Sequence, residues 1–186
     1  MTAPKFQTKF TYEDYLLFPD DGRRHELIDG EHFMTPAPTF KHQRVSSKLH
    51  KLLSVFVDER QLGFVLAAPF DVVLSDLDVV QPDLLFISTA RSSLITEKNI
   101  HGAPDLVIEI LSESTRKTDE IIKRKQYERF GVSEYWIVDP ELETVKIYRL
   151  SNQGYARAAE LSKEAADTLS TPLLPGLQIP LTAIFE

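Results

Sequence analysis

The chain has 186 residues, 42% hydrophobic and 26% charged, with a net charge of −7, which is typical of one globular domain, residues 1–186, and excludes a disordered chain. It has no cysteine, which excludes disulfides and thiolate metal sites. Because no apolar run could span a membrane and the first residues lack a signal-peptide core, we expect a cytoplasmic protein without a membrane partner.

The first third of the chain predicts a short helix, a hairpin and a long helix. Thr11 has the side chain of an N-cap for a helix that starts at residue 12. Asp29 and Gly30 lie between apolar residues within 24–34, which is typical of a tight hairpin turn. Residues 42–60 carry apolar side chains at helical spacing, so we expect a long amphipathic helix there.

The remaining two thirds predict mostly strands. A polar connection is expected from 88 to 102 and a β-rich tail at the C-terminus. This order favours an α/β (α+β) fold, a mixed β-sheet flanked by helices with an N-terminal β-hairpin region. The strands are expected at 64–74, 79–87, 104–111, 134–140 and 144–150, and the one helix among them at 117–130.

The strand at 104–111 contains a carboxylate where a buried strand should have none. It is rich in Val, Leu and Ile, which is typical of a strand buried on both faces. Side chains alternate along a strand, so Glu109 shares a face with Val107 and Leu111. A buried carboxylate needs a partner, a proton or a metal ion.

Two Pro-Asp pairs precede Glu109, and geometry distinguishes them. Asp105 lies four residues away on the same strand, roughly 13 Å along it, too far for one cation to contact both. Asp83 lies on the preceding predicted strand, where facing Cβ atoms are about 4.5–5.5 Å apart. Asp83 and Glu109 can therefore share a Mg²⁺ or Mn²⁺ ion. The alternative is two strand-end carboxylates that contact only solvent or backbone.

The helix at 117–130 adds a stripe of three side chains, Asp119, Lys123 and Tyr127, spaced four residues apart. If the stripe faces the sheet, Lys123 reaches Glu109 and can orient a water or stabilise a phosphate. An ordinary helix ion pair between Asp119 and Lys123 is the alternative. Lys125 lies about 200° around the helix and should face elsewhere. For Tyr127, the sequence favours a packing role in the core over a catalytic role.

Three further positions complete the set. Glu26 is either an additional ligand or a hairpin partner, and His42, at the start of its helix, is a possible additional site residue. Trp136 lies in an apolar run and should pack in the core.

These motifs resemble the PD-(D/E)xK nuclease superfamily, which has the restriction-endonuclease-like fold, and more closely the bacterial Uma-two family, which is classed with endonucleases. The resemblance covers nearly the whole chain, and the Asp-Lys-Tyr helix and the Glu-Tyr-Trp strand are its most specific parts. The matching residues are Glu26 to Glu31, His42-Gln43, Pro82-Asp83-Leu84, Glu109 to Ser112, Ser114-Thr115, Asp119, Lys123, Tyr127, Gly131-Val132, Glu134 to Pro140 and Pro175-Gly176-Leu177.

The resemblance implies a Mg²⁺- or Mn²⁺-dependent endonuclease that hydrolyses DNA. Asp83 and Glu109 match its acidic, metal-binding residues. The superfamily pattern places lysine at position 111, where this chain has Leu111, so Lys123 takes the lysine role. Nucleases of this fold often pair, which implies a homodimer. The absence of lysine at position 111 also leaves an alternative open, in which the protein has the same fold but is a catalytically inactive nucleic-acid-binding or interaction protein.

Overall fold

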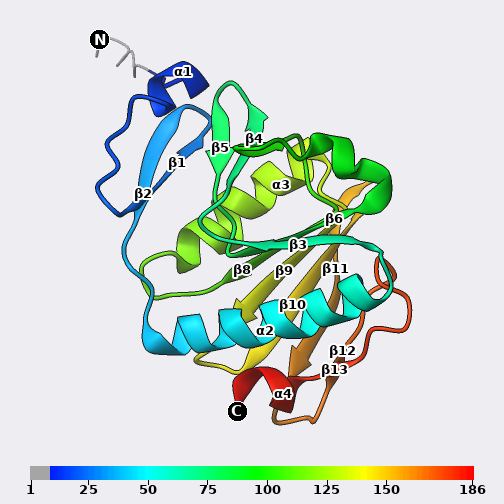
Figure 1. The fold of residues 1–186 in the computed structure, drawn as a ribbon. Coiled ribbons are helices and arrows are strands. Elements are labelled where there is room, and N and C mark those ends of the chain that lie inside the picture. Colours follow the sequence, from blue (N-terminus) through cyan, green and yellow to red (C-terminus); the bar gives the residue numbers. More distant parts are fainter. Residues whose placement is uncertain (1–8) are drawn as a thin grey trace.

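The computed structural model describes residues 9–186, and two β-sheets form its framework (Figure 1). Both are mixed, because β4 and β7 pair parallel in the first sheet and β8 and β9 in the second. In spatial order the first sheet consists of β2 (Glu31–Thr35), β1 (Arg24–Ile28), β5 (Asp78–Val80), β4 (Asp71–Ser75) and β7 (Asn99–His101), and the second of β11 (Gly154–Ser162), β10 (Thr144–Ser151), β9 (Glu134–Asp139), β8 (Leu106–Ile110), β6 (Leu84–Ser88) and β3 (Gly63–Ala67).

The helices flank these sheets, and Figure 1 shows α2 lying across the six-stranded one. Together they make up the mixed fold that the strand and helix order predicts. No helix within residues 9–186 has the length and apolar character needed to cross a membrane. The helical segments are α1 (Tyr12–Tyr15), α2 (Phe40–Glu59), the 3₁₀ helix η1 (Thr89–Leu94), the π-helix η2 (Thr118–Lys123), α3 (Arg124–Phe130) and α4 (Leu181–Phe185).

The local predictions for the N-terminal part are confirmed. The Thr11 side chain caps α1, and Asp29 and Gly30 form the turn between β1 and β2. The long helix begins at Phe40, two residues earlier than predicted, because Thr39 caps it by accepting a hydrogen bond from the His42 backbone N–H.

The predicted strands 64–74 and 79–87 are wrong as continuous elements. Each is broken by a proline, Pro69 and Pro82, which has no N–H to give to a neighbouring strand. In each of these two segments the first half belongs to one sheet and the second half to the other, so the chain crosses between the sheets once within each segment. One of these crossings ends at Asp83, directly before β6.

The C-terminal tail is only partly β-structure. Its two strands, β12 (Thr168–Leu169) and β13 (Ile179–Pro180), are two residues each and form a separate ribbon. The short helix α4 follows directly.

Alternation along β8 separates two cores. Leu106, Ile108 and Ile110 pack with the apolar face of α2, whereas Val107 and Leu111 pack with α3 and the five-stranded sheet. Because side chains alternate along a strand, Glu109 lies on the same face of β8 as Val107 and Leu111. It therefore points toward α3 and the first sheet, as the sequence predicts. The space between the two sheets therefore receives one carboxylate from the centre of the larger sheet.

Gly63 begins β3 and sets how closely β3 approaches β6. Its φ is +154°, and an added Cβ would overlap the Ile87 carbonyl oxygen and lie 2.8 Å from Ser88 Cα. We predict that Gly63→Ala lowers the free energy of unfolding by about 3 kcal/mol, measured by urea denaturation.

Gly131→Ala is the matched control, because Gly131 also has a positive φ, +81°, but an added Cβ would meet nothing within 4 Å. This variant should lose only about 1 kcal/mol. Equal losses in the two variants would contradict a steric role for the close β3–β6 approach.

Candidate active site

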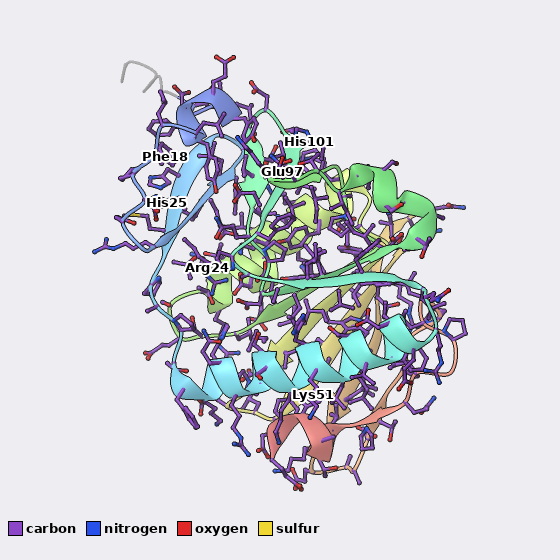
Figure 2. The ribbon with its side chains drawn as sticks, in the orientation of Figure 1. Phe18, Arg24, His25, Lys51, Glu97 and His101 are labelled. Atoms are coloured by element: carbon purple, nitrogen blue, oxygen red, sulfur yellow. The ribbon has the colours of Figure 1, made fainter. Side chains whose placement is uncertain are left out.

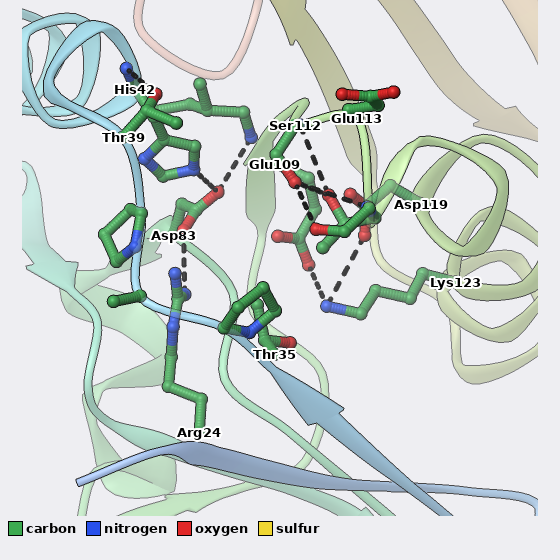
Figure 3. Close-up of a pocket in the computed structure, with 16 residues that line it drawn as sticks. Arg24, Thr35, Thr39, His42, Asp83, Glu109, Ser112, Glu113, Asp119 and Lys123 are labelled. Atoms are coloured by element: carbon green, nitrogen blue, oxygen red, sulfur yellow. Dashed lines mark hydrogen bonds and ion pairs between the residues drawn. The ribbon is translucent and has the colours of Figure 1, made fainter.

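A cavity of about 480 Å³ opens where the two sheets meet (Figure 3). Its walls come from Arg24 of β1, the loop 35–39, His42 of α2, the crossing residue Asp83 and the loop 112–115 after β8. Glu109, Asp119 and Lys123 also line it. Residues far apart in the sequence therefore meet at one opening, and most of the charged ones are nearly inaccessible to solvent.

Glu109 is held through one carboxylate oxygen. Oε1 accepts hydrogen bonds from the Lys123 ammonium at 3.0 Å and from the Tyr127 hydroxyl at 2.8 Å. Glu109 is 2% exposed and Tyr127 is completely buried. Tyr127 is therefore a core residue, as the sequence favours, and its hydroxyl also orients the carboxylate.

Lys123 connects three elements by ion pairs. Its Nζ lies 2.9 Å from Glu26 of β1, 3.0 Å from Glu109 of β8 and 3.6 Å from Asp119 of η2. The predicted Asp119–Lys123 pair is present, but it is buried and forms part of a larger cluster. The π-helical turn of η2 is the local geometry that presents both side chains to the sheet.

Asp83 has partners on both oxygens. Oδ1 accepts from the Arg24 guanidinium at 2.8 Å, and Oδ2 accepts from His42 Nε2 at 3.1 Å and from the Ile110 backbone N–H at 2.8 Å. Burial favours a higher pKa, but the His42 contact, the Arg24 charge and the Ile110 N–H outweigh it and lower the Asp83 pKa to about 2. Asp83 is therefore ionised at neutral pH.

Asp83 and Glu109 lie side by side, as predicted from strand pairing. Leu84 pairs with Ile108 in the antiparallel register of β6 and β8, so the preceding Asp83 lies opposite Glu109. Figure 3 shows both carboxylates facing the same cavity. Asp105 directly precedes the other end of β8 and pairs with Arg91 at 2.9 Å, away from Glu109, as the distance along the strand predicts.

The cluster has an excess of acidic groups. Glu26, Asp83, Glu109 and Asp119 are four carboxylates against two permanent cations, Arg24 and Lys123, which leaves two negative charges if all ionise. Burial raises the Glu109 pKa to about 8; the Lys123 charge acts against this rise, and the neighbouring carboxylates Asp119, Asp83 and Glu26 add to it. Burial likewise raises the Asp119 pKa to about 6. Burying carboxylates in excess of their cations in this way favours their protonated forms.

Several other side chains lie as predicted. Lys125 is exposed on the far side of its helix, and Trp136 is completely buried. The Glu26 side chain contacts Lys123 and the Gln81 backbone N–H and so lies within the cluster. Leu111 is packed in the core, so no strand side chain at that position reaches the site.

The sequence did not single out Arg24. It begins β1, just before the residues that carry the hairpin and family signals, and its contact with Asp83 spans 59 positions. In the part of the chain that the structure describes, no group of three or more His, Asp or Glu side chains is arranged as a complete metal site. Any cation here would take most of its ligands from elsewhere.

Comparisons with known proteins agree with this geometry. The fold is that of a crystal structure described as "a putative nuclease belonging to DUF820" from Anabaena variabilis, with a TM-score of 0.79, 21% sequence identity and coverage of 95% of this chain and 97% of that one. The model of the Uma2 family, described as "Putative restriction endonuclease", matches residues 12–182. The chain therefore belongs to the Uma2 family. A search of curated proteins finds no match.

The raised pKa of Glu109 makes a prediction about stability. Between its ordinary value of 4.5 and its folded value of about 8, the folded state binds more protons than the unfolded state. The contribution of Glu109 to the free energy of unfolding should therefore fall as pH rises from 4.5 to 8 in metal-free buffer. Glu109→Gln should flatten this dependence in urea denaturation series at several pH values.

Glu164→Gln is the matched control, because Glu164 is an exposed residue in the turn after β11. Its pH dependence should follow that of the wild type. A Glu109→Gln protein with an unchanged pH dependence would show that Glu109 does not titrate in this range.

Proposed function

We propose that this protein is a divalent-metal-dependent endonuclease that hydrolyses DNA phosphodiester bonds. The observation that carries the proposal is the excess of buried carboxylates at the base of an open cavity, in a chain of the Uma2 family. Burying this charge destabilises the fold unless something neutralises it. A site of this kind is built to receive a cation, and a cation in turn attracts a phosphate.

The donor set fits Mg²⁺ or Mn²⁺. Carboxylate oxygens suit hard cations, and Mg²⁺ is usually bound by one or two carboxylates with water and substrate phosphate as its other ligands. Asp83 and Glu109 would hold the ion, and because no group of three His, Asp or Glu side chains within residues 9–186 is arranged to hold one, water and substrate would have to supply the other ligands. When bound, the ion would supply a water with a lowered pKa and polarise the phosphate.

The residues around Glu109 position it for this role. Lys123 and Tyr127 both bond to Oε1, which orients the carboxylate, and Figure 3 shows the group turned toward the side of the cavity where Asp83 lies. Because the Lys123 ammonium already contacts three carboxylates, its contribution in this state is to hold them in place. A water or phosphate would have to displace one of these partners to contact it.

The mouth of the cavity suits a phosphodiester. Ser112, Ser114 and Thr115 line it, and their hydroxyl groups bond to one another within the loop. Hydroxyl groups of this kind commonly bond to phosphate oxygens in nucleic-acid complexes. The loop therefore provides polar contacts at the rim, above the acidic base of the site.

One observation favours a second function, a catalytically inactive nucleic-acid-binding protein. Both Asp83 oxygens and all three Lys123 ion pairs are satisfied within the chain. If these pairs never open, the site cannot bind a metal ion, and the fold would serve binding alone.

The test is cleavage of supercoiled plasmid and of single-stranded DNA with Mg²⁺, Mn²⁺ or EDTA. We expect the wild type to cleave with either ion and not to cleave in EDTA. Asp83→Asn and Glu109→Gln should each lose about a hundredfold or more in cleavage rate, because each removes a charge that holds the ion. Lys123→Met should lose activity comparably, since Glu109 would lose its orienting partner.

Glu164→Gln, an exposed position that does not line the cavity, should cleave like the wild type. Cleavage that persists in both Asp83→Asn and Glu109→Gln would place the activity elsewhere or in a contaminant. Absence of cleavage by the wild type with every ion, together with DNA binding in a shift assay, would favour the inactive binding protein.

A further inference from the structure

The two permanent cations of the site differ in how strongly they are engaged. Lys123 is 4% exposed and contacts three carboxylates. The Arg24 side chain is 19% exposed and has one carboxylate partner, Asp83. Within residues 9–186 its hydrogen bonds all come from Nη1, one to Asp83 and a long one of 3.5 Å to the Gln81 carbonyl oxygen. Among residues 9–186, Arg24 is therefore the cation whose guanidinium keeps N–H donors that could bind another group.

Arg24 also has space around it. It lines the cavity of about 480 Å³ and a neighbouring cavity of about 390 Å³, and Pro38, His42 and Asp83 line both as well. The pair of Arg24 and Asp83 thus forms part of the wall between the two cavities. Figure 2 shows Arg24 in the region between the N-terminal hairpin and α2. Its guanidinium can leave Asp83 without displacing core side chains.

The contact between Arg24 and Asp83 conflicts with metal binding at the same carboxylate. The guanidinium occupies Oδ1, and Oδ2 already accepts two hydrogen bonds from His42 and Ile110. A divalent ion on Asp83 would lie within a few Å of the Arg24 charge and would be repelled by it. Binding of the ion therefore weakens the Arg24–Asp83 pair.

We propose that Arg24 is a displaceable cation: it neutralises Asp83 while the metal ion is absent, yields Asp83 to the ion, and then binds the substrate phosphate with its freed guanidinium. This inference rests on the proposed function and adds a phosphate-binding residue to it. A guanidinium presents paired donors that match the oxygens of a phosphate. The hydroxyl-bearing loop 112–115 lines the same cavity, so both could contact one phosphodiester.

A purely structural ion pair would behave differently. If Arg24 only stabilises the fold, its removal leaves Asp83 unpaired, lowers stability and gives no gain in metal affinity. If Arg24 competes with the ion, its removal lowers stability but raises metal affinity. The direction of the change in metal affinity therefore separates the two roles.

The test is calorimetric titration of the full chain with Mn²⁺ alone, without DNA. Arg24→Met, which keeps the length of the apolar stem, should bind Mn²⁺ tighter on the order of tenfold or more, because the competing charge is gone. Arg24→Lys keeps a charge and should stay close to the wild type, and Arg24→Gln, which also removes the charge, replaces Arg24→Met if that variant folds poorly. Arg91→Met removes a similar Arg–Asp pair at the other end of β8 and should leave Mn²⁺ affinity unchanged.

A second measurement is the dependence of plasmid cleavage on DNA concentration at saturating Mn²⁺. Arg24→Met should raise KM on the order of tenfold through the lost phosphate contact. Equal or weaker Mn²⁺ binding by Arg24→Met would overturn the proposal that Arg24 competes with the ion. An unchanged KM would overturn the proposal that Arg24 contacts the substrate phosphate. If neither the wild type nor Arg24→Met binds Mn²⁺, the metal site and the proposed function both fail. Binding of equal strength by both would refute only the inference about Arg24.

Discussion

The structure depends on one buried ammonium group, that of Lys123, which three carboxylates share. Glu26, Glu109 and Asp119 come from β1, β8 and η2, so one charge joins both sheets to the helix that covers them. Buried charges are costly to desolvate, and an ion pair offsets that cost only when its geometry is good and every group has a partner. The carboxylates nevertheless outnumber their cations. If all four carboxylates of the cluster ionise, the interior of the fold carries a net negative charge, and the raised pKa values of Glu109 and Asp119 reduce that charge by favouring their protonated forms.

The position of this charge follows from how the chain moves between the sheets. Pro82 ends the strand pairing of the first sheet, and Asp83 stands at the crossing, where its carboxylate meets that of Glu109. The hairpin β1–β2 brings Glu26 and Arg24 from the other side. Acidic groups from both sheets and from η2 thus meet basic groups from β1 and η2, and the cavity between the sheets makes part of this cluster accessible from solvent.

Membership of the Uma2 family and the excess of carboxylates support the same class of chemistry from independent directions. The family match extends from residue 12 to residue 182 and includes every member of the cluster. The two central carboxylates have different environments: Asp83 stays ionised because Arg24, His42 and Ile110 stabilise its charge, whereas burial raises the pKa of Glu109 to about 8.

The sequence by itself determined the N-terminal helix and hairpin, the long helix α2, the strand β8 and the proximity of Asp83 to Glu109. Period-two alternation placed Glu109 on the inner face of β8, and four-residue spacing placed Asp119, Lys123 and Tyr127 on one stripe, because both patterns depend only on local backbone geometry. Tertiary structure alone decided that Pro69 and Pro82 divide the strands between two sheets, that Glu26 contacts Lys123, and that Arg24 covers Asp83. These contacts join residues up to 97 positions apart, and no local periodicity encodes which distant side chain fills a given space.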